Sequence, residues 1–121
     1  EGPVVFKSTE SPNVIRFSGK DPMATSSNLD FYSMGSGKRD RHMEPFMIDV
    51  KPRSGDTPPL SAHEGEEFIY VLSGVIQINY GKNTYELETG ESIYYDSVVP
   101  HDVHAKGSEN ARILAVVYAP S

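Results

Sequence analysis

The sequence predicts an all-β domain, either a sandwich or a barrel of short strands. No segment keeps an apolar period of 3.6 residues over ten residues, so no amphipathic helix of ordinary length is expected. Nine prolines and ten glycines divide the 121-residue chain into short runs, many of them rich in β-branched and aromatic side chains. Runs of this composition between Gly and Pro turns are typical of strands.

In the first half of the chain the predicted strands are short and separated by polar turns. Residues 1–28 are rich in Ser, Pro, Asn and Gly, and we expect an arm or edge strands there, with β-like runs at residues 4–6 and 14–17. Residues 29–34 predict a strand that ends at a Gly-Ser-Gly turn. Residues 46–50 alternate in polarity with a period of two, which is typical of a half-buried strand.

The second half continues this pattern after a turn rich in Pro and Gly at residues 54–59. The stretch from 68 to 80 is apolar, β-branched and aromatic, and only Ser73 and Gly74 interrupt it, which predicts two strands joined by a tight turn. Further strands, each preceded by turn residues, are predicted at residues 84–87, 92–95 and 113–118.

Charge and composition limit the partners of the chain. The net charge is −6, and residues 60–121 carry all of it, because acidic and basic side chains balance in residues 1–59. An acidic half should repel phosphate backbones, so we expect no nucleic-acid binding through this domain itself. The sequence has no cysteine and no apolar run near 18 residues, so we expect a cytoplasmic protein without a membrane span.

One stretch places ionisable groups in a strand setting. Residues of equal parity share a strand face, so Ser61, His63 and Glu67 should point to the same side as Ile69 and Val71 if no bulge intervenes. An imidazole and a carboxylate against aliphatic side chains are costly unless they are paired or bound to a metal. These residues are therefore the first candidates for a functional site.

A second histidine cluster lies further along the chain. His101 shares its strand face with Val103 and Ala105, whereas His104 points the opposite way, so parity favours His101 as the histidine that enters the core. Two histidines and one carboxylate inside a barrel would form the ligand set used for Fe(II), with open positions for substrate. The alternative is a buried polar cluster that hydrogen-bonds to itself, to water or to an organic ligand.

These residues also carry a resemblance to the cupin superfamily. Residues 55–74 resemble its first motif, and Gly55, His63, Glu67 and Gly74 all fall in register with it. Residues 90–105 are similar to the second motif. Gly90 and His101 match that motif, while Asp96, Val98 and Ala105 replace its usual Pro, Gly and Asn. The resemblance implies a double-stranded β-helix, or jelly-roll, barrel, here assigned to residues 29–121.

The resemblance leaves the metal content open. Ser61 stands where the family has its first metal-binding histidine. Matched residue by residue, the resemblance therefore implies His63, Glu67 and His101 as metal ligands. A hydroxyl is a poor ligand for a divalent transition metal, so the cofactor is either Fe, Mn, Ni or Zn, or none at all. In both cases Ser61, His63, Glu67 and His101 are the predicted ligand-binding residues.

A narrower likeness points to function. Residues 63–81, 90–105 and 111–120 resemble the C-terminal cupin domain of bacterial helix-turn-helix regulators, which implies a small-molecule sensor whose DNA contacts lie in a missing N-terminal half. The chain begins at Glu1 rather than Met, which agrees with a fragment of that kind. This sensor domain, without catalysis, is the favoured interpretation.

Two catalytic alternatives stay open, together with a prediction about assembly. The first alternative is a metal-dependent oxygenase or isomerase that uses His63, Glu67 and His101. The second is a metal-free enzyme in which His101 acts as a general base with Glu67 as its partner. Residues 68–72 and 113–118 are apolar on both faces, so we expect a homodimer to cover the face that does not line the barrel.

Overall fold

A computed structural model describes residues 13–14, 29–35, 38–53 and 60–118 and shows only strands, turns and bends there. The all-β prediction is therefore confirmed for the described part of the chain. The predicted run at residues 4–6, the turn at residues 54–59 and all of the predicted run at residues 14–17 except Val14 lie outside it. The strands are β1 (Asn13–Val14), β2 (Leu29–Ser33), β3 (Met43–Val50), β4 (Glu66–Ser73), β5 (Ile76–Tyr80), β6 (Asn83–Leu87), β7 (Ser92–Asp96), β8 (His101–Ala105) and β9 (Ala111–Tyr118).

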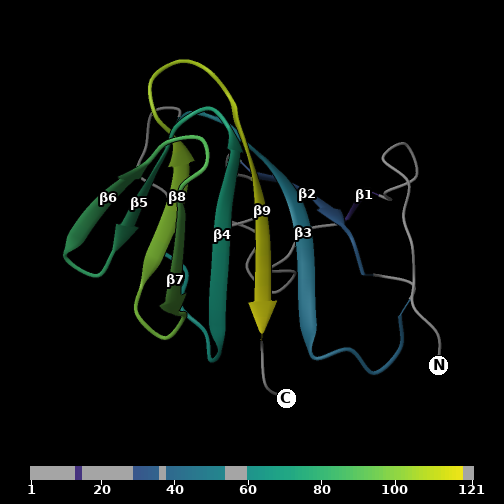
Figure 1. The fold of residues 1–121 in the computed structure, drawn as a ribbon. Coiled ribbons are helices and arrows are strands. Elements are labelled where there is room, and N and C mark those ends of the chain that lie inside the picture. The colour runs from purple at the N-terminus through teal and green to yellow at the C-terminus, as the bar shows by residue number, and fades with distance from the viewer. Residues whose placement is uncertain (1–12, 15–28, 36–37, 54–59, 119–121) are drawn as a thin grey trace.

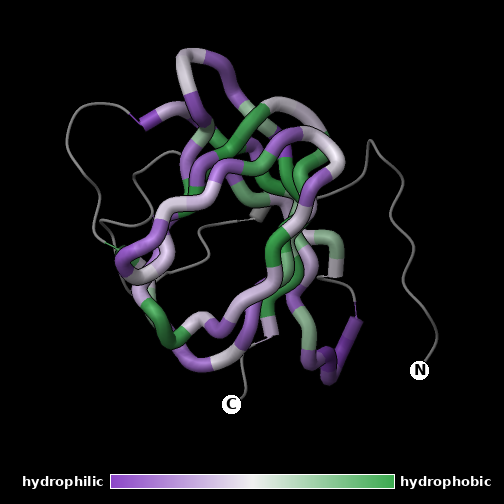
Figure 2. The backbone as a smooth tube through the Cα atoms, turned by 60° about the vertical axis from the view of Figure 1, so that its left-hand side comes forward, coloured by the Kyte–Doolittle hydropathy of each residue, from purple (hydrophilic) through white to green (hydrophobic). Residues whose placement is uncertain are grey.

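The strands form two antiparallel sheets that face each other around one core (Figure 1). The larger sheet has the order β1-β2-β3-β9-β4-β7, and the smaller has the order β6-β5-β8. The core takes side chains from both sheets, for example Val71 and Ile113 from the larger and Ile76 and Ile78 from the smaller. Figure 2 shows hydrophobic stretches gathered toward the middle of the molecule and hydrophilic stretches on many of its outer loops. This arrangement is the jelly-roll architecture that the sequence predicts.

The period-two pattern in the sequence decides which side chains enter the core. Phe46, Ile48 and Val50 on β3 are buried, with exposed fractions between 0 and 5%, while the residues between them face outward. Ile69 and Val71 on β4 are buried in the same way. Each fully buried aliphatic side chain contributes about 1.5–3 kcal/mol relative to an exposed one. Local alternation therefore identifies the inner face correctly.

The turn between β4 and β5 is the point where the chain passes from one sheet to the other. The sequence predicts two strands and a tight turn here, and both strands are present. They are not paired with each other, because β4 lies between β9 and β7 whereas β5 lies between β6 and β8. The connection passes through Gly74, whose φ is +82°, and a Cβ there would lie 2.9 Å from the Cα of Ala111.

No helix in the described part of the chain is long and apolar enough to cross a membrane.

Replacing Gly74 by alanine should destabilise the fold for two reasons, backbone strain and a clash with β9. Together they should lower the free energy of unfolding by about 2–4 kcal/mol, measured by urea denaturation. Gly90→Ala is the matched control, because Gly90 has φ +90° but nothing within 4 Å of its added Cβ. It should lose only the strain contribution, about 1–2 kcal/mol. Equal losses in the two variants would show that the contact with Ala111 contributes nothing.

Candidate metal centre

The candidate site lies at the end of the barrel where β4 and β8 begin, the lower end in Figure 1. Backbone hydrogen bonds fasten residues 61–65 to residues 97–101 at this end. The amide of His63 donates to the carbonyl of Ser97, and Ser61 and His101 exchange two hydrogen bonds of 2.8 and 2.9 Å. Because of this pairing, two segments more than thirty residues apart in sequence meet beside the start of β4.

The backbone between His63 and Glu67 is bent rather than extended. Four residues of straight strand would separate their Cα atoms by about 13 Å. Instead β4 begins only at Glu66, and Gly65 has a φ of +117°. The expectation of one unbroken strand face from Ser61 to Val71 is therefore corrected: the bend at Gly65 lets the His63 imidazole meet the Glu67 carboxylate.

Two of the predicted residues, His63 and His101, converge on one carboxylate oxygen of the third, Glu67. His63 Nε2 lies 2.9 Å from Glu67 Oε2, and His101 Nε2 lies 3.3 Å from the same oxygen. Glu67 and His101 are buried, with 9% and 4% of their surfaces exposed, while His63 is partly exposed. One ligand atom from each of the three residues lies within 4.8 Å of the other two, so together they could hold a metal ion.

The outer ring nitrogens fix how both imidazoles face the site. His63 Nδ1 lies 3.1 Å from the carbonyl oxygen of Glu64, and His101 Nδ1 lies 2.8 Å from that of Val99. A carbonyl can only accept a hydrogen bond, so both Nδ1 atoms carry protons. Both Nε2 atoms therefore face Glu67, and in neutral imidazoles they would present lone pairs. Metal-binding histidines commonly show this arrangement, with Nδ1–H donated to a backbone carbonyl.

Without a metal, two lone pairs directed at a carboxylate would repel it, so protons must take the place of the cation. The hydrogen bond to Glu67 raises the pKa of His63 above its ordinary value of 6.5, although burial opposes this. Burial lowers the pKa of His101, but the hydrogen bond and the negative charge of Glu67 outweigh burial and raise it overall. Burial raises the pKa of Glu67, but hydrogen bonds from His101, His63 and Tyr95 hold it far below its usual range.

Tyr95 is a fourth residue of the site, and the sequence alone does not identify it. Tyr95 is the cross-strand neighbour of Glu67 in the β4–β7 pair, and its hydroxyl donates to Glu67 Oε1 over 2.7 Å. Its ring is buried and lies 5.0 Å from the His101 ring. Strand parity on β7 is the available signal in the sequence, but the register between β4 and β7 depends on pairing across distant parts of the chain.

Ser61 occupies the rim of the site through its backbone. It is the cross-strand partner of His101, and opposed residues of an antiparallel pair project their side chains to the same face. The predicted ligand-binding role of Ser61 remains a proposal. Ser97, in the segment that holds His63, is fully buried, and its hydroxyl has no hydrogen-bond partner among the described residues.

His104 lies outside the site, as strand parity predicts. It is buried on the opposite face of β8 from His101, where its Nε2 lies 2.9 Å from Gln77 Oε1. Its Nδ1 lies 3.3 Å from Asp102 Oδ2, and Arg53 donates to that same oxygen over 2.7 Å. This polar network has its own partners and does not contribute to the candidate centre.

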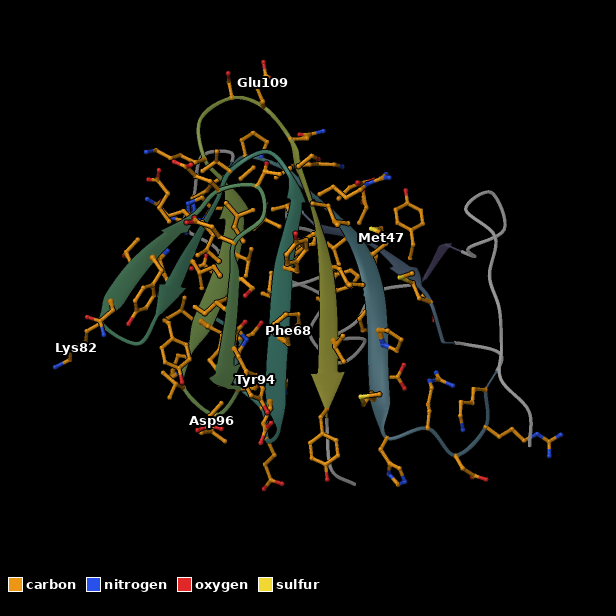
Figure 3. All side chains as sticks on the ribbon, viewed as in Figure 1. Met47, Phe68, Lys82, Tyr94, Asp96 and Glu109 are labelled. Carbon is orange, nitrogen blue, oxygen red and sulfur yellow. The ribbon has the colours of Figure 1, made fainter. Side chains whose placement is uncertain are left out.

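Acidic residues flank the centre along the chain. Glu64 and Asp96 are exposed and Glu66 is partly exposed, each beside a residue of the centre in sequence. Figure 3 places Tyr94 and Asp96 at the lower end of β7. A hollow of about 180 Å³ lies against Glu66, Tyr94, Tyr95 and Asp96. None of the three candidate ligands lines this hollow, so it is adjacent to the coordination space rather than part of it.

The donor set fits a divalent transition metal. Two imidazoles and one carboxylate are the ligands of the facial triad that binds non-haem Fe(II), and imidazole also suits Zn, Cu and Ni. The orientation of both Nε2 atoms toward Glu67 Oε2 gives a common point of approach, and a single cation there would replace the two protons. The chemistry of the residues present therefore agrees with metal binding.

Comparison with known proteins finds a family that matches the chain and an enzyme whose sequence is similar to it. A family model for the cupin domain matches residues 46–117. The (S)-2-hydroxypropylphosphonic acid epoxidase of Streptomyces wedmorensis is 35% identical over 98 residues, which are 74% of this chain and 50% of the epoxidase. The chain thus spans about half the length of this curated relative.

Solved structures show the same likeness. A structure of hydroxypropylphosphonic acid epoxidase (HppE) with Fe(II) gives a TM-score of 0.74 at 26% identity, covering 98% of this chain and 62% of that one. An HTH_3 family transcriptional regulator from Vibrio cholerae gives a TM-score of 0.62 at 23% identity, covering 78% of this chain and 52% of that one. The second likeness shows a shared fold and no more.

The protonation of the metal-free site can be tested by NMR titration of the imidazoles. Since the pKa values of His63 and His101 are raised, the two imidazolium ions stabilise the metal-free fold below their ordinary value of 6.5, and this stabilisation is lost as the pH rises through the folded values. In Glu67→Gln both pKa values should fall, because the charge of the carboxylate is gone.

The matched control for this titration is Glu66→Gln. Glu66 is the neighbouring acid, hydrogen-bonded to Tyr94 rather than to either histidine, so both imidazoles should titrate as in the wild type. Unchanged titration of His63 and His101 in Glu67→Gln would contradict the assignment of Glu67 as their shared partner.

Proposed function

The chain belongs to the cupin family, and we propose on that basis that its barrel binds one divalent metal ion, foremost Fe(II), and serves the oxidation of a small organic substrate. The observation that carries the proposal is the convergence of His63 Nε2 and His101 Nε2 on Glu67 Oε2. Three protein ligands leave other coordination positions open, which distinguishes a catalytic site from a closed structural one.

The choice of iron rests on the relative. That protein is named as an epoxidase, and its solved structures include a form with Fe(II). Its substrate is not carried over, because the chain spans only about half of that protein.

Each residue of the site has a definite role under this proposal. His63 and His101 supply neutral imidazole ligands, and the carbonyls of Glu64 and Val99 hold the required tautomer. Glu67 supplies one negative charge to offset the cation, while Ile69 and Val71 line the inner face beyond it. Bound iron supplies a redox-active Lewis acid with open coordination positions. The apolar inner face limits the access of water, which strengthens electrostatic interactions there.

A ligand-sensing domain is the second candidate. One feature of this chain favours it, because Ser61 stands where cupin metal sites often use a histidine. Under this alternative His63, Glu67 and His101 form a polar floor for an organic ligand, and no catalytic step is needed. Any such sensor requires a ligand that binds two states of the protein with different affinity.

We also propose that the chain forms a homodimer through the outer face of the larger sheet. That face carries apolar side chains on adjacent strands, including Phe68, Tyr70 and Leu72 from β4 and Leu114 and Val116 from β9. Tyr70 and Leu72 are each 38% exposed. A contiguous apolar sheet face of this kind is typical of an interface. A second copy would cover it without requiring another protein.

Metal titration tests the proposed function. Protein purified without chelator and then titrated anaerobically with Fe(II) should bind about one equivalent, and His101→Ala should weaken binding by more than about 100-fold, since loss of a ligand exceeds the effect of an outer-shell partner. His42→Ala is the control, because His42 is exposed in the β2–β3 connection, and it should bind as the wild type does.

Less than about a tenth of an equivalent of Fe(II), Mn(II), Ni(II) or Zn(II) bound by wild-type protein would contradict the metal centre and favour the sensor. Circular dichroism of His101→Ala must still show β structure, so that the loss of binding reports the ligand rather than the fold.

The assembly is tested by sedimentation equilibrium. The wild-type chain should sediment at twice its mass of 13.4 kDa. Tyr70→Lys combined with Val116→Lys should give the monomer mass, because two buried cations would oppose association. Lys82→Glu, on the β5–β6 turn of the other sheet, should remain dimeric. A wild-type mass near 13.4 kDa at micromolar concentration would contradict the dimer.

A further inference from the structure

We propose that Tyr95 is a positioning residue that sets the coordination mode of Glu67, holding it as a ligand through one oxygen. This inference rests on the proposed metal centre. The number of coordination positions that the Glu67 carboxylate occupies then depends on this tyrosine, whichever substrate is used.

The two carboxylate oxygens of Glu67 have separate partners. Oε1 accepts a hydrogen bond of 2.7 Å from the Tyr95 hydroxyl, whereas Oε2 faces His63 Nε2 at 2.9 Å and His101 Nε2 at 3.3 Å. A carboxylate that binds a metal through both oxygens must turn both toward the ion. The hydrogen bond from Tyr95 opposes that rotation, because it holds Oε1 away from the shared approach of the two imidazoles.

Tyr95 is itself held in place on three sides. Its backbone pairs with Glu67 across the β4–β7 ladder, and only 7% of the residue is exposed. Its ring centroid lies 5.0 Å from that of His101 and 5.0 Å from that of Tyr80. Tyr80 is in turn fixed by a 3.0 Å hydrogen bond from its hydroxyl to the carbonyl of Asp96. The ring of Tyr95 is therefore fixed where its hydroxyl reaches Glu67 Oε1.

The consequence for the site is an additional open position. Two imidazoles and a carboxylate bound through one oxygen occupy three positions of a six-coordinate ion, and a carboxylate bound through both oxygens occupies one more. Tyr95 thus keeps space free for substrate beside the metal.

The outward neighbour of Tyr95 provides a matched control. Tyr94 lies next to it on β7, and its hydroxyl also donates to a glutamate, Glu66, but this pair is on the exposed side of the sheet. Tyr94→Phe and Tyr95→Phe therefore remove the same chemical group from equivalent tyrosine–glutamate pairs. Only the second pair includes a proposed ligand.

The test uses Co(II), which is stable in air, as the probe for the full chain. Infrared difference spectra recorded on Co(II) binding report the separation between the two carboxylate stretches, which is wide for one-oxygen binding and narrower for two-oxygen binding. Bands missing in Glu67→Gln belong to Glu67. Wild type and Tyr94→Phe should show the wide separation. Tyr95→Phe should show a narrower one, an altered visible Co(II) spectrum and an affinity about 10–100-fold weaker.

The outcomes separate this inference from the proposed function. If Tyr95→Phe binds Co(II) with the bands and affinity of the wild type, the role of Tyr95 is overturned while the metal centre stands. A narrow separation in wild-type protein overturns it as well, whether or not the variant folds. If wild-type protein binds no Co(II), the metal centre is overturned and the role of Tyr95 with it.

Discussion

Glu67 places a carboxylate against the apolar inner face of the barrel, where an unpaired charge would be costly. The rest of the site offsets that cost. Two imidazoles approach Oε2, and a buried phenol donates to Oε1. Nδ1 of each imidazole donates to a backbone carbonyl, so Nε2 is the atom that faces Glu67. Positive charge must therefore lie between the Nε2 atoms and the carboxylate, either as two protons or as one metal cation. Protonation of the two imidazoles and metal binding are therefore alternative solutions to the same electrostatic constraint.

The fold supplies the positions that this constraint requires. Pairing between residues 61–65 and 97–101 joins the ends of two sheets and places His63 and His101 beside the start of β4. The bend at Gly65 turns His63 back toward Glu67, and the β4–β7 register brings Tyr95 opposite it. Each group is thus fixed by backbone hydrogen bonds rather than by side-chain contacts alone. A site held in this way needs little rearrangement when it binds a cation, which is what preorganisation means in energetic terms.

Membership of the cupin family determines the architecture and leaves the chemistry to the site. Ser61 stands where the family resemblance would supply one more imidazole, so the proposed metal centre has three protein ligands and more open coordination positions. The chain spans about half of the epoxidase that it resembles, so this likeness does not by itself assign a substrate.

The sequence by itself determined the strands and the inner face, because alternation such as that of Phe46, Ile48 and Val50 is a local property of extended backbone. It also identified His63, Glu67 and His101, whose spacing follows a family motif. Only the tertiary structure decided that β4 and β5 belong to different sheets and that Gly65 bends the chain. It alone placed Tyr95 on Glu67. The assignment of β4 and β5 to different sheets and the position of Tyr95 depend on register between strands distant in sequence, which is set by the packing of the whole barrel and not by any local preference.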